Sequence, residues 1–306
     1  MSSVLIYCEA TKLAQELLSA AKLIDRQVYG VSINDDEQAM ALAACGANLL
    51  KINQTELCLA DTAAVASVLK QAADKVNADI ILLSSNRTGK ELAGRVAQIL
   101  GAGCLTNVNQ ITINNDRIEC TRNALGGATV AVQVIKTNKK VIALSPKSFE
   151  PAQEGAGGSA TDLAVKTVSR IKLVEVKEKT AASVDIGAAE LLIAIGQGVD
   201  DHSQLAMAED IAIALGGEVA CSKPVATDKK WLDEERIIGI SGTICKPEVA
   251  ILLGISGQVQ FSVGIRDAKT IIAVNSDENA QICDMSDYVL VADLKEVIPE
   301  LKSVLA

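Results

Sequence analysis

The amino-acid sequence predicts an α/β protein in which an N-terminal α/β domain with a parallel sheet precedes a C-terminal doubly wound domain. Short apolar runs alternate with amphipathic helical stretches through the first hundred residues, and the same alternation starts again near residue 190. Repetition of this kind favours parallel sheets that are covered by helices on both faces. Apolar residues make up 49% of the 306 residues, which is ample material for a packed core.

The first half of the chain predicts a βα succession followed by a region rich in strands. Strands are expected at 4–8, 28–32, 48–52 and 79–84. The helices that follow them are expected at 12–23, 37–44, 61–76 and 89–100. Beyond Gly103 come shorter strands with little helix between them, at 108–113, 117–121, 129–134 and 141–144.

The end of this domain contains a loop, a strand and a linker. Residues 151–160 are small and predict a loop, and the alternation over 171–176 predicts one more edge strand. Residues 177–185 are polar and poor in apolar side chains, which is typical of an interdomain linker. The predicted domains are therefore 1–184 and 185–306.

The C-terminal domain restarts the βα succession. Strands are expected at 191–195, 218–221, 236–238, 249–253, 270–274 and 288–291. Asp200 or Asp201 can cap a helix that runs to Leu215, and Asp293 can open a final helix that reaches about Leu305.

Composition excludes several classes of protein. The net charge of -9, the lack of a basic run and the aromatic content of 2% all argue against nucleic-acid binding. No apolar stretch approaches the ~18 residues that a membrane span needs, so a cytoplasmic protein is expected. The eight cysteines include no C-x-x-C pair and the chain has a single histidine, which favours buried free thiols over a metal site.

A glycine-containing turn follows the first strand of the C-terminal domain. Gly196 and Gly198 flank Gln197, directly before a predicted helix. The third glycine of the dinucleotide-binding fingerprint is absent, because Asp201 stands there. The turn can therefore be a tight βα connection and nothing more, or part of a nucleotide site.

The tetrapeptide Gly-Ile-Ser-Gly occurs twice, at 239–242 and at 254–257. Glycine lets backbone N–H groups approach an anion closely, and serine adds a hydroxyl. Residues 258–263 resemble a first helical turn whose N–H groups would face that anion. A pyrophosphate suits such a site, although small residues also recur at strand ends by chance.

Other polar residues are expected at the same edge of the sheet. Asn275 ends a strand, and Asp293 is either a helix cap or a hydroxyl acceptor. Ser222 and Lys223 end another strand and offer a cation, although a solvated lysine is the simpler interpretation. No nucleophile–base pair is evident, and the loop that begins at Asn86 lacks Walker spacing and predicts a capped turn.

Three C-terminal segments carry a resemblance to a known family. They are Lys246-Pro-Glu-Val-Ala-Ile-Leu-Leu-Gly-Ile-Ser-Gly-Gln-Val-Gln260, Lys269-Thr-Ile-Ile-Ala-Val-Asn275 and Ser286-Asp-Tyr-Val-Leu-Val-Ala-Asp-Leu294. In sequence and spacing they closely resemble the α subunit of electron-transfer flavoprotein. The segments Cys221-Ser-Lys-Pro224 and Trp231 to Gly239 resemble its FixB-type branch.

The resemblance implies an electron carrier, not an independent enzyme. Such α subunits pair with an electron-transfer flavoprotein β subunit and hold FAD mostly in the C-terminal domain. They accept electrons from an acyl-CoA dehydrogenase-like or other redox partner and pass them to a reductase or quinone pathway. The residues implied at the FAD site are Gln197, Ser222, Lys223, Gly239, Ile240, Ser241, Gly254, Ser256, Gly257, Gln258, Val259, Gln260, Phe261, Asn275, Asp293 and Leu294.

The chain departs from the family pattern at three of these positions. Gln197 and Lys223 stand where many members have arginine, and Phe261 stands where many have histidine. Phenylalanine donates no hydrogen bond and lysine lacks the planar fork of arginine, so we expect a lower one-electron potential. The departures also leave open a redox-inactive, nucleotide-binding regulatory subunit. An independent NAD-dependent dehydrogenase is disfavoured by the missing third glycine and the lack of an acid–base pair.

Overall fold

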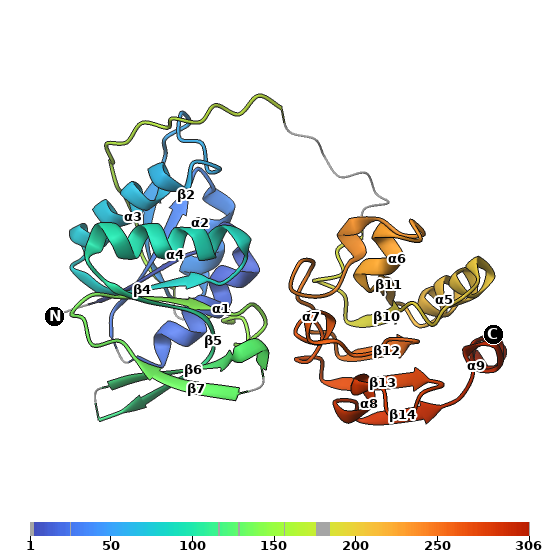
Figure 1. Ribbon diagram of the computed structural model, residues 1–306. Coiled ribbons are helices and arrows are strands. Elements are labelled where there is room, and N and C mark those ends of the chain that lie inside the picture. Colours follow the sequence, from blue (N-terminus) through green and yellow to red (C-terminus); the bar gives the residue numbers. More distant parts are fainter. Residues whose placement is uncertain are drawn as a thin grey trace. The chain divides into compact units, whose positions relative to one another are not determined.

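The computed structural model describes residues 3–24, 26–115, 117–127, 129–155, 157–175 and 184–305. The chain divides into two compact units, residues 1–176 and 177–306 (Figure 1). Most of the predicted linker, residues 177–183, lies outside the described residues. Each unit is built around its own sheet.

The N-terminal unit has a nine-stranded sheet in the order β7-β6-β5-β8-β4-β1-β2-β3-β9. Neighbours are parallel except for β5–β6 and β6–β7, which are antiparallel. The predicted parallel sheet with a strand-rich continuation is thus confirmed. The strands are β1 (Ser3–Tyr7), β2 (Val28–Ile33), β3 (Asn48–Ile52), β4 (Ala78–Ser84), β5 (Gly103–Asn114), β6 (Arg117–Ala124), β7 (Thr129–Val134), β8 (Lys140–Leu144) and β9 (Ala160–Asp162).

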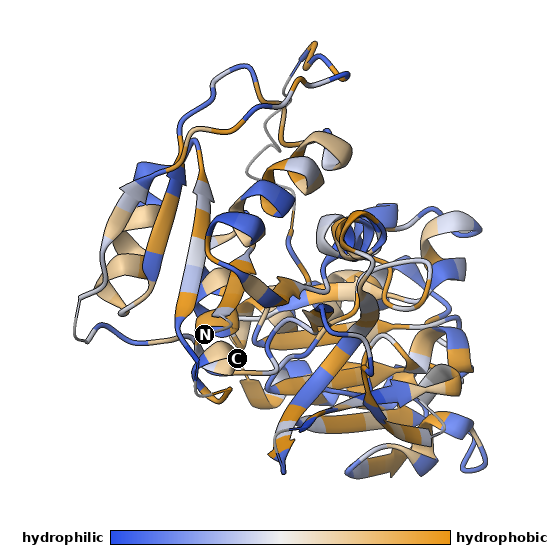
Figure 2. Cartoon of the chain, turned by 90° about the vertical axis from the view of Figure 1, so that its left-hand side faces the viewer, coloured by the Kyte–Doolittle hydropathy of each residue, from blue (hydrophilic) through white to orange (hydrophobic). Residues whose placement is uncertain are grey.

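Helices cover both faces of the parallel part of this sheet. Alternate residues of β1 face opposite cores: Val4 and Ile6 pack with α1 and α2, whereas Leu5 and Tyr7 pack with α3 and α4. Hydrophobic residues accordingly form long orange stretches along the strands in Figure 2. The helices are α1 (Thr11–Lys22), α2 (Asp36–Ala44), α3 (Thr62–Lys75) and α4 (Arg87–Leu100).

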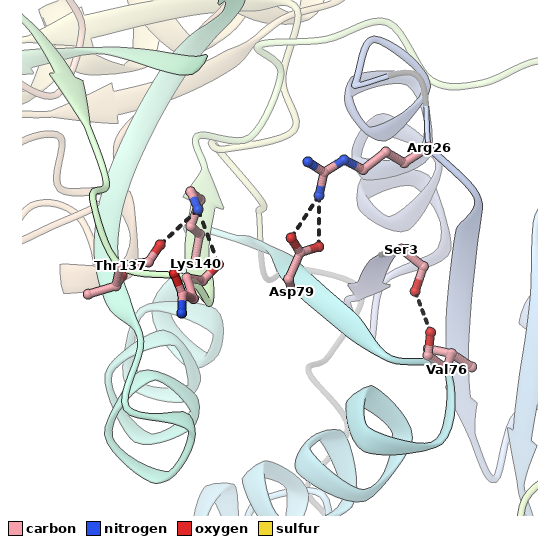
Figure 3. A network of polar contacts seen from close by, with 7 residues as sticks. Ser3, Arg26, Val76, Asp79, Thr137 and Lys140 are labelled. Carbon is pink, nitrogen blue, oxygen red and sulfur yellow. Dashed lines mark hydrogen bonds and ion pairs between the residues drawn. The ribbon is translucent and has the colours of Figure 1, made fainter. Parts of the chain in front are cut away.

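The amino-terminal ends of the central strands are held by polar contacts, which Figure 3 shows. The Ser3 hydroxyl donates to the Val76 carbonyl at 2.7 Å, next to the start of β4. Arg26 binds the Asp79 carboxylate through one guanidinium nitrogen at 2.8 Å to each oxygen. These contacts fix the starts of β1 and β4.

The predicted edge strand over 171–176 is wrong. Residues 171–175 have no regular secondary structure, and Val176 lies outside the described residues. The open edge of β3 is taken instead by β9, which pairs in parallel through Leu49 and Ala160. An alternating apolar pattern needs a partner edge to become a strand, and β9 already occupies the edge of β3, so Ile171 stays half exposed.

Residues 163–170, which follow β9 and which we call the strap, are held by side chains in and beside α3. The Gln71 amide exchanges two hydrogen bonds with the backbone of Lys166, at 2.9 and 3.0 Å. Asp61 caps α3 by accepting from Ala64 N–H with one oxygen, and it accepts from Arg170 N–H at 2.7 Å with the other. One carboxylate thus joins a helix start to the end of the strap.

The C-terminal unit has a five-stranded sheet in the order β11-β10-β12-β13-β14, and every pair is parallel. One face packs against α5, α6 and α9, and the other against α7 and α8. The predicted doubly wound fold is confirmed. The elements are β10 (Leu191–Ile195), α5 (His202–Ala214), β11 (Glu218–Cys221), α6 (Lys223–Thr227), β12 (Val249–Leu253), α7 (Val259–Ser262), β13 (Thr270–Asn275), α8 (Gln281–Asp284), β14 (Tyr288–Val291) and α9 (Leu294–Leu305).

The predicted strand over 236–238 is wrong. A 3-10 turn, η2 (Glu234–Arg236), occupies its start, and Ile237 and Ile238 form only isolated bridges with Cys221 and Thr243. The chain turns away at Gly239, whose φ of 135° ends any extended run. The apolar residues that suggested a strand are buried, so they serve the core without joining the sheet.

Both sheets end in an exposed apolar edge strand. In β7, Val130 and Val132 are 65% and 62% exposed, and they lie on the same face of the strand. In β14 all four side chains are exposed, from Tyr288 at 66% to Val289 at 42%. Within the described chain, each sheet therefore has one free and largely apolar border.

Asp61 generates a prediction about pH. Its two backbone hydrogen bonds, the larger effect coming from Arg170, lower its pKa below the ordinary 3.8. Because the folded pKa is the lower one, the stabilisation is complete above the unfolded value and is lost as the pH falls through the folded value. In urea unfolding, Asp61→Ala should be less stable than wild type at about pH 7, and the difference should shrink below about pH 4.

The control is Glu37→Ala, which removes an exposed carboxylate from α2. It should follow the wild-type pH dependence throughout. A constant difference between Asp61→Ala and wild type over the acid range would contradict the assignment. Faster proteolysis of the strap in Asp61→Ala would support it independently.

Candidate functional site

The strand order places a topological switch point in the C-terminal sheet. The chain leaves β10 for β11 on one side, whereas β12 lies on the other side of β10. In open α/β sheets, ligands bind at the carboxyl ends of the strands where the order reverses. The loops after β10 and β12 meet there, and they contain the first glycine turn and the second Gly-Ile-Ser-Gly.

Backbone hydrogen bonds join these two loops. Gly196 N–H donates to Leu253 at 2.8 Å, and Gly198 N–H donates to the Gly254 carbonyl at 3.1 Å. A Cβ atom on Gly196 would lie 2.1 Å from the Gly254 oxygen, so no larger residue fits without moving the second loop. The close contact between the two loops therefore requires glycine in this turn, whether or not a ligand binds there.

The second loop offers a row of free donors. Gly254 and Gly257 have φ of 62° and 86°, a left-handed conformation that suits glycine. In the described part of the chain, the backbone N–H groups of residues 256–260 donate to no protein acceptor. The residues 256 and 258–260 are exposed. Consecutive free amides of this kind form a concave anion-binding surface.

Two side chains stabilise this loop from behind. Asn275, the last residue of β13, donates to the Ile255 carbonyl at 2.8 Å. The Ser262 hydroxyl donates to the Gly257 carbonyl at 2.9 Å and is buried. Sequence reasoning placed Asn275 at the site as a ligand contact and missed Ser262. Nothing in the sequence around Ser262 predicts this role, because a serine at the end of a short helix can equally be solvated.

The first Gly-Ile-Ser-Gly lies against α7. Ile240 N–H donates to the Gln260 carbonyl at 2.9 Å, and a Cβ on Gly239 would lie 2.3 Å from that same oxygen. Ile240 is 62% exposed and Ser241 is exposed as well. The two copies of the tetrapeptide thus meet through the turn that contains Gln260.

The other candidate residues lie at neighbouring strand ends. Ser222 N–H donates to the Ile195 carbonyl at 3.0 Å, directly before α6, and Lys223 is exposed as the first residue of that helix. Asp293 accepts from Lys295 N–H at 2.9 Å, so it caps α9 as the simpler interpretation predicted. Gln197 is exposed between its two glycines.

Two candidates face the core. Phe261 is 6% exposed and packs among the apolar residues beneath α7, and Leu294 is 5% exposed on the opposite face of the sheet. Their side chains stabilise the unit, and the Phe261 N–H donates to the Gln258 carbonyl at 2.9 Å. Phe261 therefore contributes to the core, and its side chain offers no hydrogen-bond donor to a ligand.

The N-terminal sheet has its own switch point, between β1 and β4, and it is nearly filled. The space there measures about 10 Å³ and is lined by Tyr7, Glu9 and Asn86, among others. This is enough for about one water molecule. The Asn86 side chain accepts from Gly89 N–H at 2.7 Å, so the loop is the capped turn that its sequence predicts. A nucleotide does not fit there.

The thiols near the strand ends are unreactive in this fold. Burial raises the pKa of Cys221 to about 12 and that of Cys8 to about 11. A thiol with such a pKa is protonated at neutral pH and is a weak nucleophile. Among the described residues, no group of three or more His, Cys, Asp or Glu side chains is placed to hold a metal ion. In that part of the chain, no helix has both the length and the apolarity to cross a membrane.

Comparison with known proteins identifies the family. Residues 5–170 match the model of the electron transfer flavoprotein domain, and residues 185–266 match that of the electron transfer flavoprotein FAD-binding domain. The chain belongs to the electron transfer flavoprotein family. Its FAD-binding domain is of the α type, so the chain is an α subunit of that family.

The curated relatives refine this assignment. Protein FixB of Escherichia coli O157:H7 and of Shigella dysenteriae serotype 1 are each 30% identical over 311 residues, covering 100% of this chain and 98% of the relative. The resemblance to FixB-type proteins is confirmed. A solved structure titled Spinosyn Rhamnosyltransferase SpnG is 9% identical over 99% of this chain and 90% of its own, and its TM-score of 0.31 is too low to support an argument.

A matched pair of glycine substitutions tests the geometry of the second loop. Gly257 and Gly216 both have positive φ, so alanine at either position should cost about 1–2 kcal/mol of unfolding free energy. At Gly257 the added Cβ would also lie 2.2 Å from Ile282 N, whereas at Gly216 it meets open space. Gly257→Ala should therefore lose about 1 kcal/mol or more beyond Gly216→Ala in urea unfolding. Equal losses would show that the loop is loosely packed.

Proposed function

We propose that this chain holds FAD at the switch point of its C-terminal sheet and carries electrons between a dehydrogenase and a reductase or quinone pathway. It does so as a heterodimer with an electron-transfer flavoprotein β subunit. The FAD-binding domain spans 185–306, and 1–184 is the scaffold of the heterodimer. The observation that supports the site is the row of free amides at 256–260, where the loops after β10 and β12 meet.

These residues fit a dinucleotide in polarity and in place. Ser256 to Gln260 would hold the diphosphate through backbone N–H groups, and Asn275 and Asp293 lie toward the adenosine side. Ser222, Lys223 and the loop 239–241 would flank the isoalloxazine ring. FAD supplies the redox chemistry, since it exchanges one or two electrons, and the protein supplies binding, orientation and electrostatics.

The site favours a carrier over an enzyme that transforms a small substrate. Most of the candidate residues are exposed, and they include no nucleophile with an adjacent base. His202, the single histidine, contacts the ring of Trp231 edge-on at 5.6 Å. Electrons would thus pass between the flavin and a docked protein such as an acyl-CoA dehydrogenase or another redox partner.

A second candidate is a redox-inactive nucleotide-binding subunit of a flavoprotein complex. It is favoured by Gln197, which brings no charge to the first turn, and by Phe261, whose ring lies in the core. The free amides at 256–260 would bind the phosphates of ADP as well as those of FAD, so the backbone alone does not separate the two functions.

Purification of the αβ pair separates them. The chain is co-produced with an electron-transfer flavoprotein β subunit, and flavin is measured by absorbance after denaturation. The carrier function predicts bound FAD near one per heterodimer, with the flavin reducible by a dehydrogenase. Tight ADP or AMP binding in equilibrium dialysis, with no affinity for FAD, would establish the second candidate.

Lys223 generates a prediction about potential. An exposed ammonium beside the ring would stabilise the negative charge of the reduced flavin, because charge near N1 and N5 tunes flavin electronics. Lys223→Met should lower the two-electron midpoint potential by about 30 mV, which corresponds to about 1.4 kcal/mol. The measurement is a reductive titration against a reference dye.

The control for this experiment is Lys269→Met. Lys269 is 74% exposed and precedes β13, so it lies at the opposite end of the strands from the candidate site. Its substitution should leave the potential unchanged, and Lys223→Arg should not lower it, because arginine keeps the charge. Equal potentials for Lys223→Met and wild type would place the ring away from Lys223.

A further inference from the structure

One lysine outside the sequence-predicted site binds the first glycine turn. Lys229 lies between α6 and η2, and its ammonium donates to the carbonyls of Gln197 at 3.2 Å and Val199 at 2.5 Å. The same nitrogen lies 4.4 Å from the ring centroid of Trp231. Lys229 thus connects the segment after α6 to the turn that follows β10.

The contact of Lys229 with Gln197 affects the second loop because the Gln197 carbonyl and the Gly198 N–H belong to one peptide group. Lys229 donates to the oxygen of this peptide group, and the Gly198 N–H donates to the Gly254 carbonyl at 3.1 Å. A continuous path of hydrogen bonds therefore runs from the ammonium to the start of the second loop. A charged donor polarises such a chain and strengthens it.

The charge of Lys229 is also not neutralised by a carboxylate. Within the described residues, no acidic side chain forms an ion pair with it, and its ammonium contacts only carbonyl oxygens and the face of the indole. The side chain is half-buried. A positive charge therefore lies within hydrogen-bond distance of the turn whose Gly198 contacts the second loop.

We propose that Lys229 is a positioning residue of the nucleotide site: it fixes the peptide between Gln197 and Gly198 against Gly254 and adds positive charge behind the diphosphate. This inference rests on the proposed function, because that function identifies the ligand as FAD. Lys229 would act on the part of the site that holds the diphosphate. Trp231 is the only tryptophan in the chain, and its ring makes a cation–π contact with the Lys229 ammonium.

The test uses Lys229→Met in the purified αβ pair, with Lys230→Met as the matched control. Lys230 is the next residue, is exposed, and loses the same charge and donors when substituted. We expect Lys229→Met to weaken binding of FAD by about tenfold or more, because it removes two hydrogen bonds from a charged donor. Binding of ADP should weaken by the same factor. Lys230→Met should bind as wild type, and Lys229→Arg should recover most of the affinity.

A second measurement does not depend on a bound nucleotide. In the pair stripped of flavin, hydrogen exchange of the Gly198 amide should be faster in Lys229→Met than in wild type, while amides of β12 keep their protection. Unchanged exchange at Gly198, or unchanged affinity for both FAD and ADP, would overturn the role of Lys229. A wild-type pair that binds no FAD would refute the proposed function instead, and the exchange of Gly198 would still decide whether Lys229 positions the turn.

Discussion

The close approach of two backbone segments is the constraint on which the C-terminal unit depends. The turn after β10 and the loop after β12 touch through Gly198 and Gly254, with no side chain between them. This contact is possible only with glycine, and it leaves the following amides without internal partners. The same geometry therefore stabilises the unit and creates the anion-binding surface, so neither property can be altered alone.

The two units of the chain use the same kind of fold to different ends. Both sheets are wound on both faces and both have a switch point. In the N-terminal unit that point is filled by Tyr7 and by the cap formed by Asn86. In the C-terminal unit, small residues and free amides occupy the equivalent place. Side-chain size at the strand ends, and not topology, thus separates a filled switch point from one with free backbone amides.

Much of this arrangement could be predicted from the sequence, because apolar runs and helix periodicity reflect burial directly. The strands of both parallel sheets and the caps Asn86 and Asp293 follow from local residues. Prediction fails where contacts between residues distant in sequence determine the structure. Residues 160–162, and not 171–175, pair with β3, and this choice is not written in either segment alone. The contact of Lys229 with Gln197 spans two helices and a strand. The burial of Phe261 likewise depends on how α7 lies on the sheet.

The apolar borders formed by β7 and β14 set conditions for the life of the isolated chain. A free edge with unpaired N–H and carbonyl groups can add any strand that meets it, including one from another copy. Charged side chains, which usually prevent such contact, are missing from the four residues of β14. The two borders are therefore the places along the described sheets where the isolated chain is most open to pairing with another strand.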